Sequence, residues 1–406
     1  MLQNPVKNSP KNSVTATYEN ALEWLFAQTR GGAPRSAERM RALLARLELE
    51  SPAKVVHVVG TNGKGSVAAM LAAGYEAAGW RTGRFISPHI ESFRERITVN
   101  GRWISEAEVL RFVRALPDHE PAPAFFELTL ALALRHFARE RVQVAVVEAG
   151  VGAEHDATRV LENVRSVVIT NVGRDHLDTL GPTLLDVARD KADAIRPGVL
   201  TLTGATGEAL GVITEVAARR GSPLFSTPHS SRLPLGTPAR TPTERRNQQL
   251  VAATLRRDGL SEAATSRGLS ATLPARAERF NVNGKVVLLD GAHNPDAARA
   301  LLEHTLTPHA QTPFVLLFGA LPKKLGAETL EVLRTHAEHT VLTNAVPGAA
   351  SALQTSSGAG LEFVAEPETA LETALTRCRE GGLLVIAGSF YLAGRLRPPL
   401  KRLAEG

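Results

Sequence analysis

The sequence predicts an α/β protein built around a parallel sheet, and three observations support this fold class. Short apolar runs rich in valine, isoleucine and leucine alternate with longer stretches of helical periodicity. These runs are apolar on both faces, which is typical of strands covered by helices on either side. The first run, Val55–Val59, leads directly into a glycine-rich turn and a helical segment, Val67–Ala78. This order is typical of a nucleotide-binding sheet.

The N-terminal part of the chain contains a first series of predicted elements. The strands are Val55–Val59, Arg84–Ile86, Gln143–Val147, Ser166–Thr170 and Leu200–Thr203. The helices between them are Glu106–Leu116, Phe126–Arg139 and Leu184–Ile195. In a parallel sheet of this kind, functional loops follow the carboxyl ends of the strands.

A second series begins after a loop and a further helix. The segment Thr227–Thr243 is rich in Pro, Ser, Thr and Arg, which predicts an exposed loop, and Arg246–Arg257 predicts a helix. The second series of strands is Val286–Leu289, Phe314–Phe318, Thr340–Leu342 and Leu383–Ala387. Because 406 residues exceed one ordinary core, we predict two domains, 1–277 and 278–406, with the boundary close to Ala277–Gly284.

Composition favours a globular protein that handles small anionic molecules. Hydrophobic residues make up 43% of the chain and charged residues 22%, and 47 Lys and Arg against 41 Asp and Glu give a net charge of +6. Aromatic residues are only 5% and no dense basic run occurs, which argues against nucleic-acid binding. The single cysteine, Cys378, is typical of a reducing compartment. Met1–Ser13 lacks the apolar core of a signal peptide and no apolar run is long enough to cross a bilayer, so we expect a cytoplasmic protein without a membrane partner.

The glycine-rich turn has the composition of a phosphate-binding loop, and its residues are Gly60, Thr61, Asn62, Gly63, Lys64, Gly65 and Ser66. Glycines allow backbone N–H groups to converge on one anion, and the N-terminus of the next helix adds partial positive charge. Lys64 can reach phosphate oxygens, and the Ser66 hydroxyl can bind a phosphate-bound Mg²⁺. Gly65 separates these two residues, so the loop departs from the strict Walker A spelling. The lysine, the serine and the preceding strand together predict nucleotide binding.

Two further strands end in groups that can bind a metal ion. Glu148 follows the strand Gln143–Val147, where a carboxylate can hold a metal near phosphates, although an ordinary polar strand end explains it equally well. Asp175 and His176 follow the next strand, and neutral imidazole is a common metal ligand. A lone histidine suits a surface position, but its pairing with Glu148 and Ser66 favours a metal site.

Two other segments carry polar residues with different explanations. The charged helix Leu184–Ile195 is by itself typical of a solvated face with local ion pairs. In the second series, a strand leads into Asp290-Gly291-Ala292-His293-Asn294-Pro295. Asn294 suits a helix cap and Pro295 suits the first turn. Local structure does not explain Asp290 or His293, which makes these two residues functional candidates.

Eight motifs occur in order between residues 57 and 394: HVVGTNGKGSVAAM, FISPHIESFRERI, FFELTLALAL, EAGVGAEHDAT, TNVGRDHLDTLG, DVARDKADAI, LLDGAHNPDAA and GSFYLAG. In this set the chain resembles the folylpolyglutamate synthases and dihydrofolate synthases of the Mur ligase superfamily. The resemblance implies a P-loop Mur-ligase-type ATPase domain joined to a smaller Rossmann-like C-terminal domain. It also implies an active site in the cleft between them.

The resemblance further implies the reaction. Members of the family use ATP and Mg²⁺ to join L-glutamate to a folate, or to dihydropteroate. A carboxylate is a poor electrophile, so it first takes the γ-phosphoryl of ATP, and the amine of glutamate then attacks the acyl phosphate. The reactants are anionic, so Mg²⁺ and cationic side chains must offset their repulsion.

The resemblance implies a phosphoryl-transfer set around the loop. Lys64 is similar to the phosphate-binding lysine, and Ser66, Glu148 and His176 are similar to metal ligands. Lys191 matches a lysine that many relatives carry as a carbamate bridging to a second metal ion, so two Mg²⁺ ions are implied. Lys64, His176 and Lys191 are therefore the expected catalytic residues.

The resemblance also implies two binding sets. The positions similar to ATP-contacting residues are Asn247, which is expected near adenine, Arg276, which is expected near the phosphates, and Asp290 and His293. The positions similar to the pterin-substrate site are Ser87, Pro88, His89, Phe93 and Arg96 in a mobile loop, and Phe126, Asp156 and Ala157 in the pocket. Core packing is an alternative for Phe126, because it begins an amphipathic helix.

Three segments depart from the family pattern. Residues 152–159 read Gly-Ala-Glu-His-Asp-Ala-Thr-Arg where Gly-Gly-Arg-Leu-Asp-Ala-Thr-Asn is usual, residues 319–325 lack the usual Asp-Lys-Asp, and Arg174 replaces an apolar residue. In addition, Ala275 stands where relatives have glycine before Arg276, so that loop lacks the freedom of glycine. None of these changes touches the phosphate loop or the metal set, so ligase chemistry is still implied while substrate preference stays open.

Two alternatives compete with a folate ligase, which is either bifunctional or adds glutamate only. A Mur-type ligase acting on a nucleotide-linked cell-wall precursor usually needs a further N-terminal domain, whereas only residues 1–59 precede the loop. A nucleotide-dependent binding module would bind or hydrolyse ATP without incorporating glutamate. From the family we expect a monomer.

Overall fold

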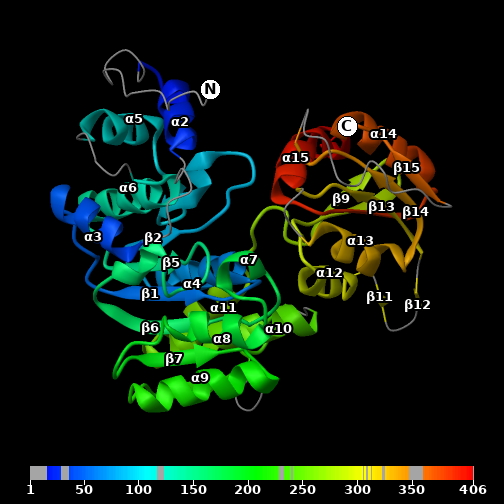
Figure 1. Ribbon diagram of the computed structural model, residues 1–406. Coiled ribbons are helices and arrows are strands. Elements are labelled where there is room, and N and C mark those ends of the chain that lie inside the picture. The colour runs from blue at the N-terminus through cyan, green and yellow to red at the C-terminus, as the bar shows by residue number, and fades with distance from the viewer. Residues whose placement is uncertain are drawn as a thin grey trace, which may run out of the picture.

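The computed structural model describes residues 16–28, 36–116, 123–227, 233–238, 241–304, 306–307, 310–311, 313–321, 325–346 and 360–405. Within these ranges the chain forms two large sheets, each with helices on both faces (Figure 1). The first sheet has eight strands in the order β4-β3-β2-β5-β1-β6-β7-β8, and the second has six in the order β15-β14-β13-β16-β10-β9. The predicted α/β fold class is confirmed.

The central strands of the first sheet are parallel, and β1 pairs with both β5 and β6. The edge strands β3 and β4 are antiparallel and, like β8, too short to give a periodic signal in the sequence. All five predicted strands form, with small shifts at their ends. The bounds are β1 Val55–Val59, β2 Thr82–Phe85, β3 Ile97–Val99, β4 Arg102–Trp103, β5 Val144–Glu148, β6 Val164–Ile169, β7 Leu200–Thr203 and β8 Leu224–Ser226.

Alternate residues of the first sheet pack against different helices. Val56 and Val58 belong to a core shared with α4, α10 and α11, whereas Val55 belongs to a core shared with α2, α3, α5 and α6. A third core joins β6 to α8 and α9. The helices are α2 Tyr18–Ala27, α3 Ala37–Arg46, α4 Lys64–Ala77, α5 Glu106–Ala115, α6 Phe125–Arg139, α7 Leu177–Leu180, α8 Leu184–Ala192, α9 Gly207–Arg219, α10 Pro242–Arg257 and α11 Glu262–Leu269, and the short 3₁₀ helices are η1 Phe93–Arg96 and η2 Ala157–Val160.

Helix α10 begins earlier than the sequence predicted. Its first residue is Pro242, not Arg246, because Thr241 caps the helix and Glu244 completes a capping box. These residues had been assigned to the loop Thr227–Thr243, and that assignment was wrong at its C-terminal end. The earlier start brings the first turn of α10 to the boundary with the second sheet.

The second sheet is covered by α14 and α15 on one face and by α12 and α13 on the other. Its first strand, β9, is antiparallel to β10, and the other neighbouring pairs are parallel. The strands are β9 Glu278–Val282, β10 Lys285–Leu289, β13 Phe314–Phe318, β14 Ala337–Leu342, β15 Leu361–Phe363 and β16 Leu383–Ala387, with a separate hairpin of β11 Leu306–Thr307 and β12 Ala310–Gln311. The helices are α12 Pro295–Leu302, α13 Gly326–Arg334, α14 Pro367–Arg377 and α15 Phe390–Glu405.

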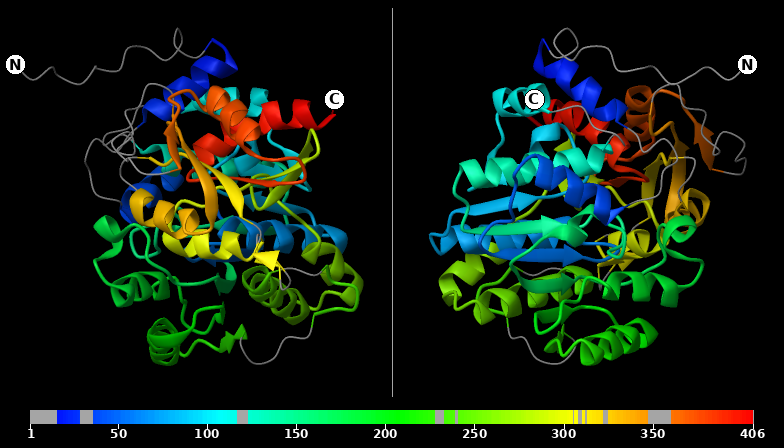
Figure 2. Two further views of the ribbon diagram at one scale, coloured as in Figure 1. Left: turned by 90° about the vertical axis from the view of Figure 1, so that its right-hand side faces the viewer. Right: turned by 60° about the vertical axis from the view of Figure 1, so that its left-hand side comes forward.

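The two sheets with their helices lie side by side in Figure 1, and in the turned views of Figure 2 one body lies in front of the other. The N-terminus of α12 meets the phosphate loop, since Asn294 and Asn62 are hydrogen-bonded. Helix α15 meets the loop that follows β2, where a Cβ at Gly394 would lie 2.2 Å from the carbonyl oxygen of Ile90. The strand ends of the first sheet therefore face elements of the second. Among the described residues, no helix combines the length and apolar character needed to span a bilayer.

Candidate active site

The glycine-rich loop lies between β1 and α4, and its conformation depends on glycine. Gly60 has φ 147° and Gly63 has φ 80°, which L side chains rarely adopt. Space is also limiting, since a Cβ at Gly60 would lie 2.0 Å from the Thr170 hydroxyl and one at Gly63 would lie 2.7 Å from the amide nitrogen of Asn247. The loop is thus a tight backbone turn that ends at the N-terminus of a fourteen-residue helix.

Lys64 is the first residue of α4, and its side chain folds back over the loop. Its Nζ donates to the carbonyl oxygens of Gly60 and Thr61 at 3.1 Å each. Burial lowers the pKa of Lys64, while the carboxylates of Glu148 and Asp175 act in the opposite direction. The ammonium group is therefore held between the loop and two carboxylates from neighbouring strand ends.

A cavity of about 280 Å³, termed here the phosphate cavity, brings together groups predicted from separate motifs. Its lining includes Lys64, Glu148, His176, Arg276 and His293. The first three come from the first sheet and the last two from the region around the second, so this cavity lies between the two bodies. Parallel strands place their carboxyl ends at one edge, which explains why these distant segments meet.

Glu148 is 2% exposed, and its Oε2 accepts a hydrogen bond from the backbone N–H of Ser87 at 3.1 Å. Burial raises the pKa of Glu148, and Lys64 opposes that shift. His176 lies beside it in the cavity, with left-handed backbone at φ 52° and Nε2 3.9 Å from Asp175 Oδ2. Ser66 points to a small adjoining cavity that Arg276 also lines.

These donors fit a nucleotide-bound Mg²⁺ better than a metal site made by protein alone. Among the described residues, no group of three or more His, Cys, Asp or Glu side chains is arranged to hold an ion. Mg²⁺ usually takes only one or two protein ligands and fills its other positions with phosphate oxygens and water. A buried carboxylate at Glu148 and the hydroxyl of Ser66 have the required hard-oxygen chemistry.

Lys191 is 3% exposed, so its position is not the solvated one that the charged helix by itself suggests, and it lies near the phosphate loop as the family resemblance implied. Its Nζ donates to the carbonyl oxygen of Gly60 at 3.2 Å. Burial, followed by the nearby charge of Lys64, lowers the pKa of Lys191 to about 7. Asp190 is also buried, at 8% exposure, because its Oδ2 accepts from the backbone N–H of Ala153 at 2.9 Å. One side of α8 thus faces the site.

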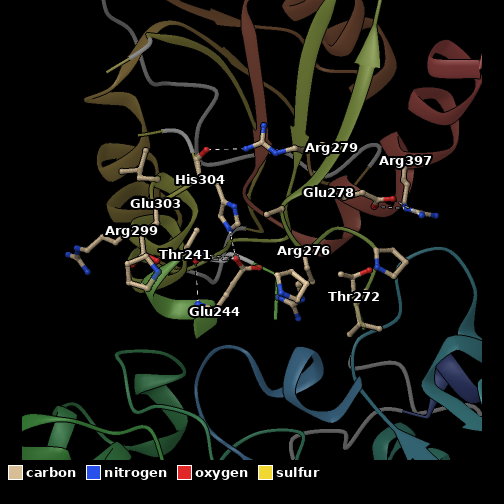
Figure 3. Close-up of a pocket in the computed structure, with 16 residues that line it drawn as sticks. Thr241, Glu244, Thr272, Arg276, Glu278, Arg279, Arg299, Glu303, His304 and Arg397 are labelled. Carbon is tan, nitrogen blue, oxygen red and sulfur yellow. Dashed lines mark hydrogen bonds and ion pairs between the residues drawn. The ribbon is translucent and has the colours of Figure 1, made fainter. Parts of the chain in front are cut away.

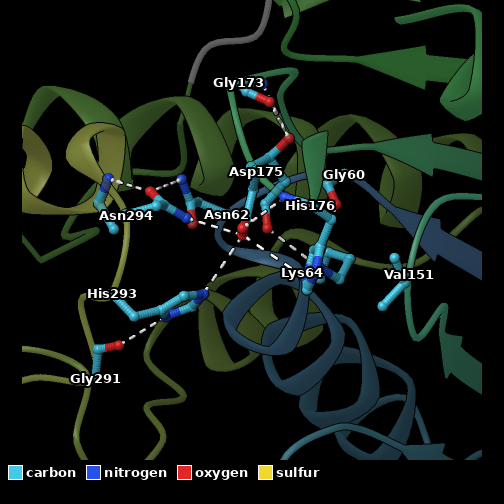
Figure 4. Close-up of polar contacts among 12 residues, drawn as sticks. Gly60, Asn62, Lys64, Val151, Gly173, Asp175, His176, Gly291, His293 and Asn294 are labelled. Atoms are coloured by element: carbon cyan, nitrogen blue, oxygen red, sulfur yellow. Dashed lines mark hydrogen bonds and ion pairs between the residues drawn. The ribbon is translucent and has the colours of Figure 1, made fainter. Parts of the chain in front are cut away.

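Asp175 joins the first body to α12 of the second (Figure 4). Its Oδ2 accepts from Asn294 Nδ2 at 3.1 Å and lies 3.4 Å from His293 Nε2. Asn294 and Asn62 exchange a reciprocal pair of amide hydrogen bonds at 3.0 and 3.1 Å. Asn294 also caps α12, as predicted, but its contact with Asn62 has no local signal because the two residues are 232 positions apart.

Arg276 lies where three cavities meet, and its guanidinium stands 4.4 Å from the Phe390 ring. Asp290 supports its loop, since Asp290 Oδ2 accepts from the N–H of Ala277 at 2.7 Å. Burial raises the pKa of Asp290, and Arg276 opposes the shift. Ala275 has φ 51°, so this loop adopts a left-handed conformation without glycine.

The largest of these cavities, about 1420 Å³, extends from Arg276 between α10 and α12 (Figure 3). Thr241 and Glu244 line it from α10 and its cap, and Glu303 and His304 line it from the end of α12. The small cavity that holds Ser66 and Asn247 shares Glu244 and Arg276 with it. The small cavity beside Ser66 and Asn247 therefore adjoins this wider space.

A second large cavity, about 1040 Å³ and termed here the substrate pocket, gathers most of the predicted substrate residues. Its lining includes Ser87, Pro88, His89, Arg96, Phe126, Asp156 and Ala157. Phe93 is the exception: it is buried beneath the pocket, where its ring packs near those of Phe26 and Phe125. Phe26, Phe125, His155 and Tyr391 also line the pocket but were not predicted as site residues. Phe26 lies outside the eight motifs, and the other three lie within motifs in which other residues were assigned the substrate role.

The loop Ser87–Arg96, termed here the substrate loop, lies beside Phe125 and Phe126. His89, Phe125 and Phe126 form an aromatic wall of the pocket. Arg96 Nε donates to His89 Nδ1 at 2.8 Å, and its guanidinium lies 5.1 Å from the Phe125 ring. Burial, aided by Arg96, lowers the pKa of His89 to about 4, so the imidazole is neutral. Phe126 packs 5.6 Å from Phe85 and also faces the pocket, so packing and lining roles coexist.

The substrate pocket and the phosphate cavity adjoin each other. Ser87, Pro88, Gly150, Phe390 and Tyr391 line both. Three of these five residues are linked to Glu148 or Arg276: Ser87 donates to Glu148, Gly150 follows Glu148 closely in sequence, and the Phe390 ring lies under Arg276. A group bound in the pocket can therefore extend one end toward the phosphate loop.

Comparisons with known proteins agree with this arrangement. Residues 58–196 match the Mur ligase middle domain, and residues 275–390 match the Mur ligase, glutamate ligase domain. The chain is 30% identical over 430 residues to a dihydrofolate synthase/folylpolyglutamate synthase of Bacillus subtilis, covering 95% of this chain and 99% of that protein. A bifunctional folylpolyglutamate synthase/dihydrofolate synthase of Yersinia pestis, solved with AMPPNP and Mn, superposes with a TM-score of 0.85 at 27% identity over 97% of this chain and all of that chain. Another such bifunctional enzyme, solved with Mn, AMPPNP and L-glutamate, gives 0.83 at 28% identity over 94% and 98%.

Proposed function

This chain belongs to the folylpolyglutamate synthase and dihydrofolate synthase family of Mur ligases, which are ATP-dependent ligases that add L-glutamate to folates, and from that premise we propose that it acts on both folates and dihydropteroate at the site described above. The observation that supports this site most directly is that the phosphate cavity and the substrate pocket adjoin and share five lining residues. ATP enters from one side and the pterin-bearing acceptor from the other. The acceptor carboxylate then meets the γ-phosphate near Lys64.

The nucleotide side uses groups from both bodies. The phosphate loop receives the phosphates on backbone N–H groups at the N-terminus of α4, and Lys64 and Arg276 supply positive charge. Asn247 and the wide cavity beyond Arg276 receive the nucleoside end. Lys64 exchanges its bonds to the loop carbonyls for phosphate oxygens when ATP binds.

The acceptor side uses the aromatic wall and Asp156. Phe126 and Phe125 offer flat apolar faces to the pterin and benzoyl rings. Asp156 offers a carboxylate to ring N–H groups, and the neutral His89 offers its Nε2–H to a carbonyl. Anchored in this way, the glutamyl end of the acceptor reaches past Ser87 toward the phosphate cavity.

Phosphoryl transfer requires charge neutralisation and alignment. A divalent metal bound with ATP neutralises phosphate charge, and Ser66, Glu148 and His176 are the side chains that would hold it. The lowered pKa of Lys191, about 7, supports a neutral amine that can add CO₂, releasing one proton and forming an anionic carbamate. We include that carbamate and a second Mg²⁺ in the proposal, with a monomer as the active unit because both cavities are built by one chain.

One assay tests the function. Purified protein is incubated with ATP, Mg²⁺ and labelled L-glutamate, with dihydropteroate and tetrahydrofolate in parallel reactions. The proposal expects label in both products, and only when ATP and metal are present. Label with tetrahydrofolate alone would restrict the enzyme to glutamate addition. ATP hydrolysis without labelled product from folded protein would indicate a nucleotide-dependent module and refute the folate assignment.

A further inference from the structure

We propose that His57 is a positioning residue for the pterin-bearing substrate, acting through the Thr158 hydroxyl on the carboxylate of Asp156. This inference rests on the proposed function, since it concerns the acceptor side of that site. His57 is the only polar residue of β1, and it is 1% exposed in the middle of a strand of valines. Neither strand formation nor the chemistry above explains a histidine there.

Three hydrogen-bonded side chains connect β1 to the substrate pocket. His57 Nε2 lies 2.8 Å from Thr158 Oγ1, and Thr158 Oγ1 lies 2.6 Å from Asp156 Oδ1. Asp156 lines the pocket, whereas Thr158 is fully buried behind it. The histidine therefore reaches the pocket through one intermediate residue.

The chemistry of the three groups fixes where the protons lie. An ionised carboxylate only accepts hydrogen bonds, so the Thr158 hydroxyl donates its single proton to Asp156. The same oxygen must then accept from His57, which places the imidazole proton on Nε2. Nδ1 is left as a bare acceptor, and it is buried without a hydrogen-bond partner among the described residues. Burial lowers the pKa of His57 to about 3, which agrees with a neutral ring that carries one proton.

Both oxygens of Asp156 are restrained, Oδ1 by the relay and Oδ2 by a backbone N–H. Oδ1 accepts from the hydroxyl and from the backbone N–H of Thr158 at 3.0 Å, and Oδ2 accepts from the N–H of Val151 at 2.9 Å. A simple cap of η2 would need only the backbone bond from Thr158. The additional hydroxyl and imidazole hold the carboxylate plane, which matters for a group that must match two N–H donors on a flat ring.

The position of His57 also ties the relay to the nucleotide side. It lies two residues before Val59, at which β1 enters the phosphate loop. One rigid, central strand thus sets the loop that holds ATP and the histidine that orients the acceptor ligand. Because the His57 side chain is hydrogen-bonded to Thr158 and through it to Asp156, we expect a change of this side chain to affect recognition of the acceptor and not of ATP.

Steady-state kinetics on matched variants test the inference. His57→Leu and Thr158→Val each remove one link and should raise KM for dihydropteroate and tetrahydrofolate about tenfold, which corresponds to one lost charge-assisted contact. KM for ATP should stay within about twofold. The double variant should be no worse than either single variant, because the two residues act in series. His57→Gln, whose amide can still donate to Thr158, should recover most of the loss.

Ser166→Ala is the control for disturbing a buried polar group beside β1. Ser166 lies opposite Val56 on β6, is buried, and its hydroxyl has no partner among the described residues. It should leave every KM unchanged. If instead His57→Leu and Thr158→Val change only the thermal midpoint, or raise KM for ATP as much as KM for the acceptors, His57 has a merely structural role and the inference is overturned.

A tautomer measurement gives a second, activity-free test. Nitrogen NMR of protein labelled at histidine, with the His57 signal assigned by its loss in His57→Gln, should show a neutral ring protonated at Nε2. A ring protonated at Nδ1 would overturn the relay. If the wild-type protein ligates glutamate to no acceptor, the proposed function fails and the inference fails with it. Ligation with unchanged acceptor KM in the variants overturns the inference alone.

Discussion

Gly394→Ala offers a sharp test of whether the second body controls the proposed acceptor site. In an ordinary helix interior, this change should stabilise the protein by about 1 kcal/mol, because alanine is the better helix former. At Gly394 in α15, however, the new Cβ would lie 2.2 Å from the carbonyl oxygen of Ile90. Ordinary contact begins near 3.4 Å, so the helix or the loop must shift by about 1.2 Å.

The Ile90 loop cannot yield that distance locally. Glu95 accepts hydrogen bonds from three consecutive backbone N–H groups, those of residues 90–92. Glu91 pairs with Arg397 and Lys401 of α15, which ties the loop to the same helix that would push it away. Overpacking of this kind costs about 1 to 3 kcal/mol, and a misplacement of about 1 Å in a catalytic site can lower the rate about a hundredfold.

The expected result is a fall in kcat/KM for the folate of tenfold or more, about 1.4 kcal/mol, with ADP affinity nearly unchanged. Labelled-glutamate kinetics and ADP calorimetry measure the two quantities, and a thermal melt confirms folding. Gly211→Ala is the matched control, since Gly211 lies within α9 with nothing within 4 Å of its added Cβ. If Gly394→Ala keeps wild-type kinetics, as Gly211→Ala should, the loop and α15 do not form a functional contact.

Four further predictions follow from single contacts. Lys64→Ala and His176→Ala should each lower ligase activity about a hundredfold or more without a change in the thermal midpoint beyond a few degrees; wild-type rates would refute the site. Chelation of divalent metal should abolish glutamate incorporation, and added Mg²⁺ should restore it. The pKa of His57, about 3 in the folded chain, is below its ordinary value, so its contribution to stability should fall as pH drops below about 6.5, by up to about 1.4 kcal/mol per unit. Urea titrations of His57→Gln should show a smaller slope, and His89, whose pKa is lowered to about 4, accounts for part of the slope that remains. Tyr75→Phe removes a 2.5 Å bond from the phenol to Asp258 and should lower the free energy of unfolding by about 1 to 3 kcal/mol while leaving kinetics unchanged.

The strands and the phosphate loop could be predicted because their signals are local. A run such as Val144–Val147 must be buried on both faces, and a carboxylate placed after it must lie at the sheet edge where the other strands end. That reasoning, together with the family resemblance, predicted that Glu148, His176 and Lys64 lie together, and all three line the phosphate cavity. The resemblance likewise anticipated seven of the eight residues expected around the acceptor, which line the substrate pocket.

Contacts between distant segments could not be predicted in this way. The pairing of Asn62 with Asn294 depends on how the second body docks, and neither residue has a neighbour in sequence that signals it. Burial of Asp190 depends on the loop at Ala153, so a charged helix looked solvated although one side is not. Phe26 of α2 lines the pocket, and its ring stacks on that of Phe125 with 5.1 Å between the ring centroids. The amphipathic spacing of α2 cannot tell a pocket-lining phenylalanine from one that packs in the core.

The substrate loop connects the phosphate cavity to the second body. At one end, the N–H of Ser87 donates to Glu148, so the loop is fixed to a carboxylate of the phosphate cavity. At the other end, Glu91 pairs with Arg397, so the loop moves with α15. A shift of the second body must therefore change the substrate pocket and the surroundings of Glu148 together. Because the proposed transfer needs the acceptor and the phosphates aligned, this loop couples the docking of the second body to the alignment of both reactants.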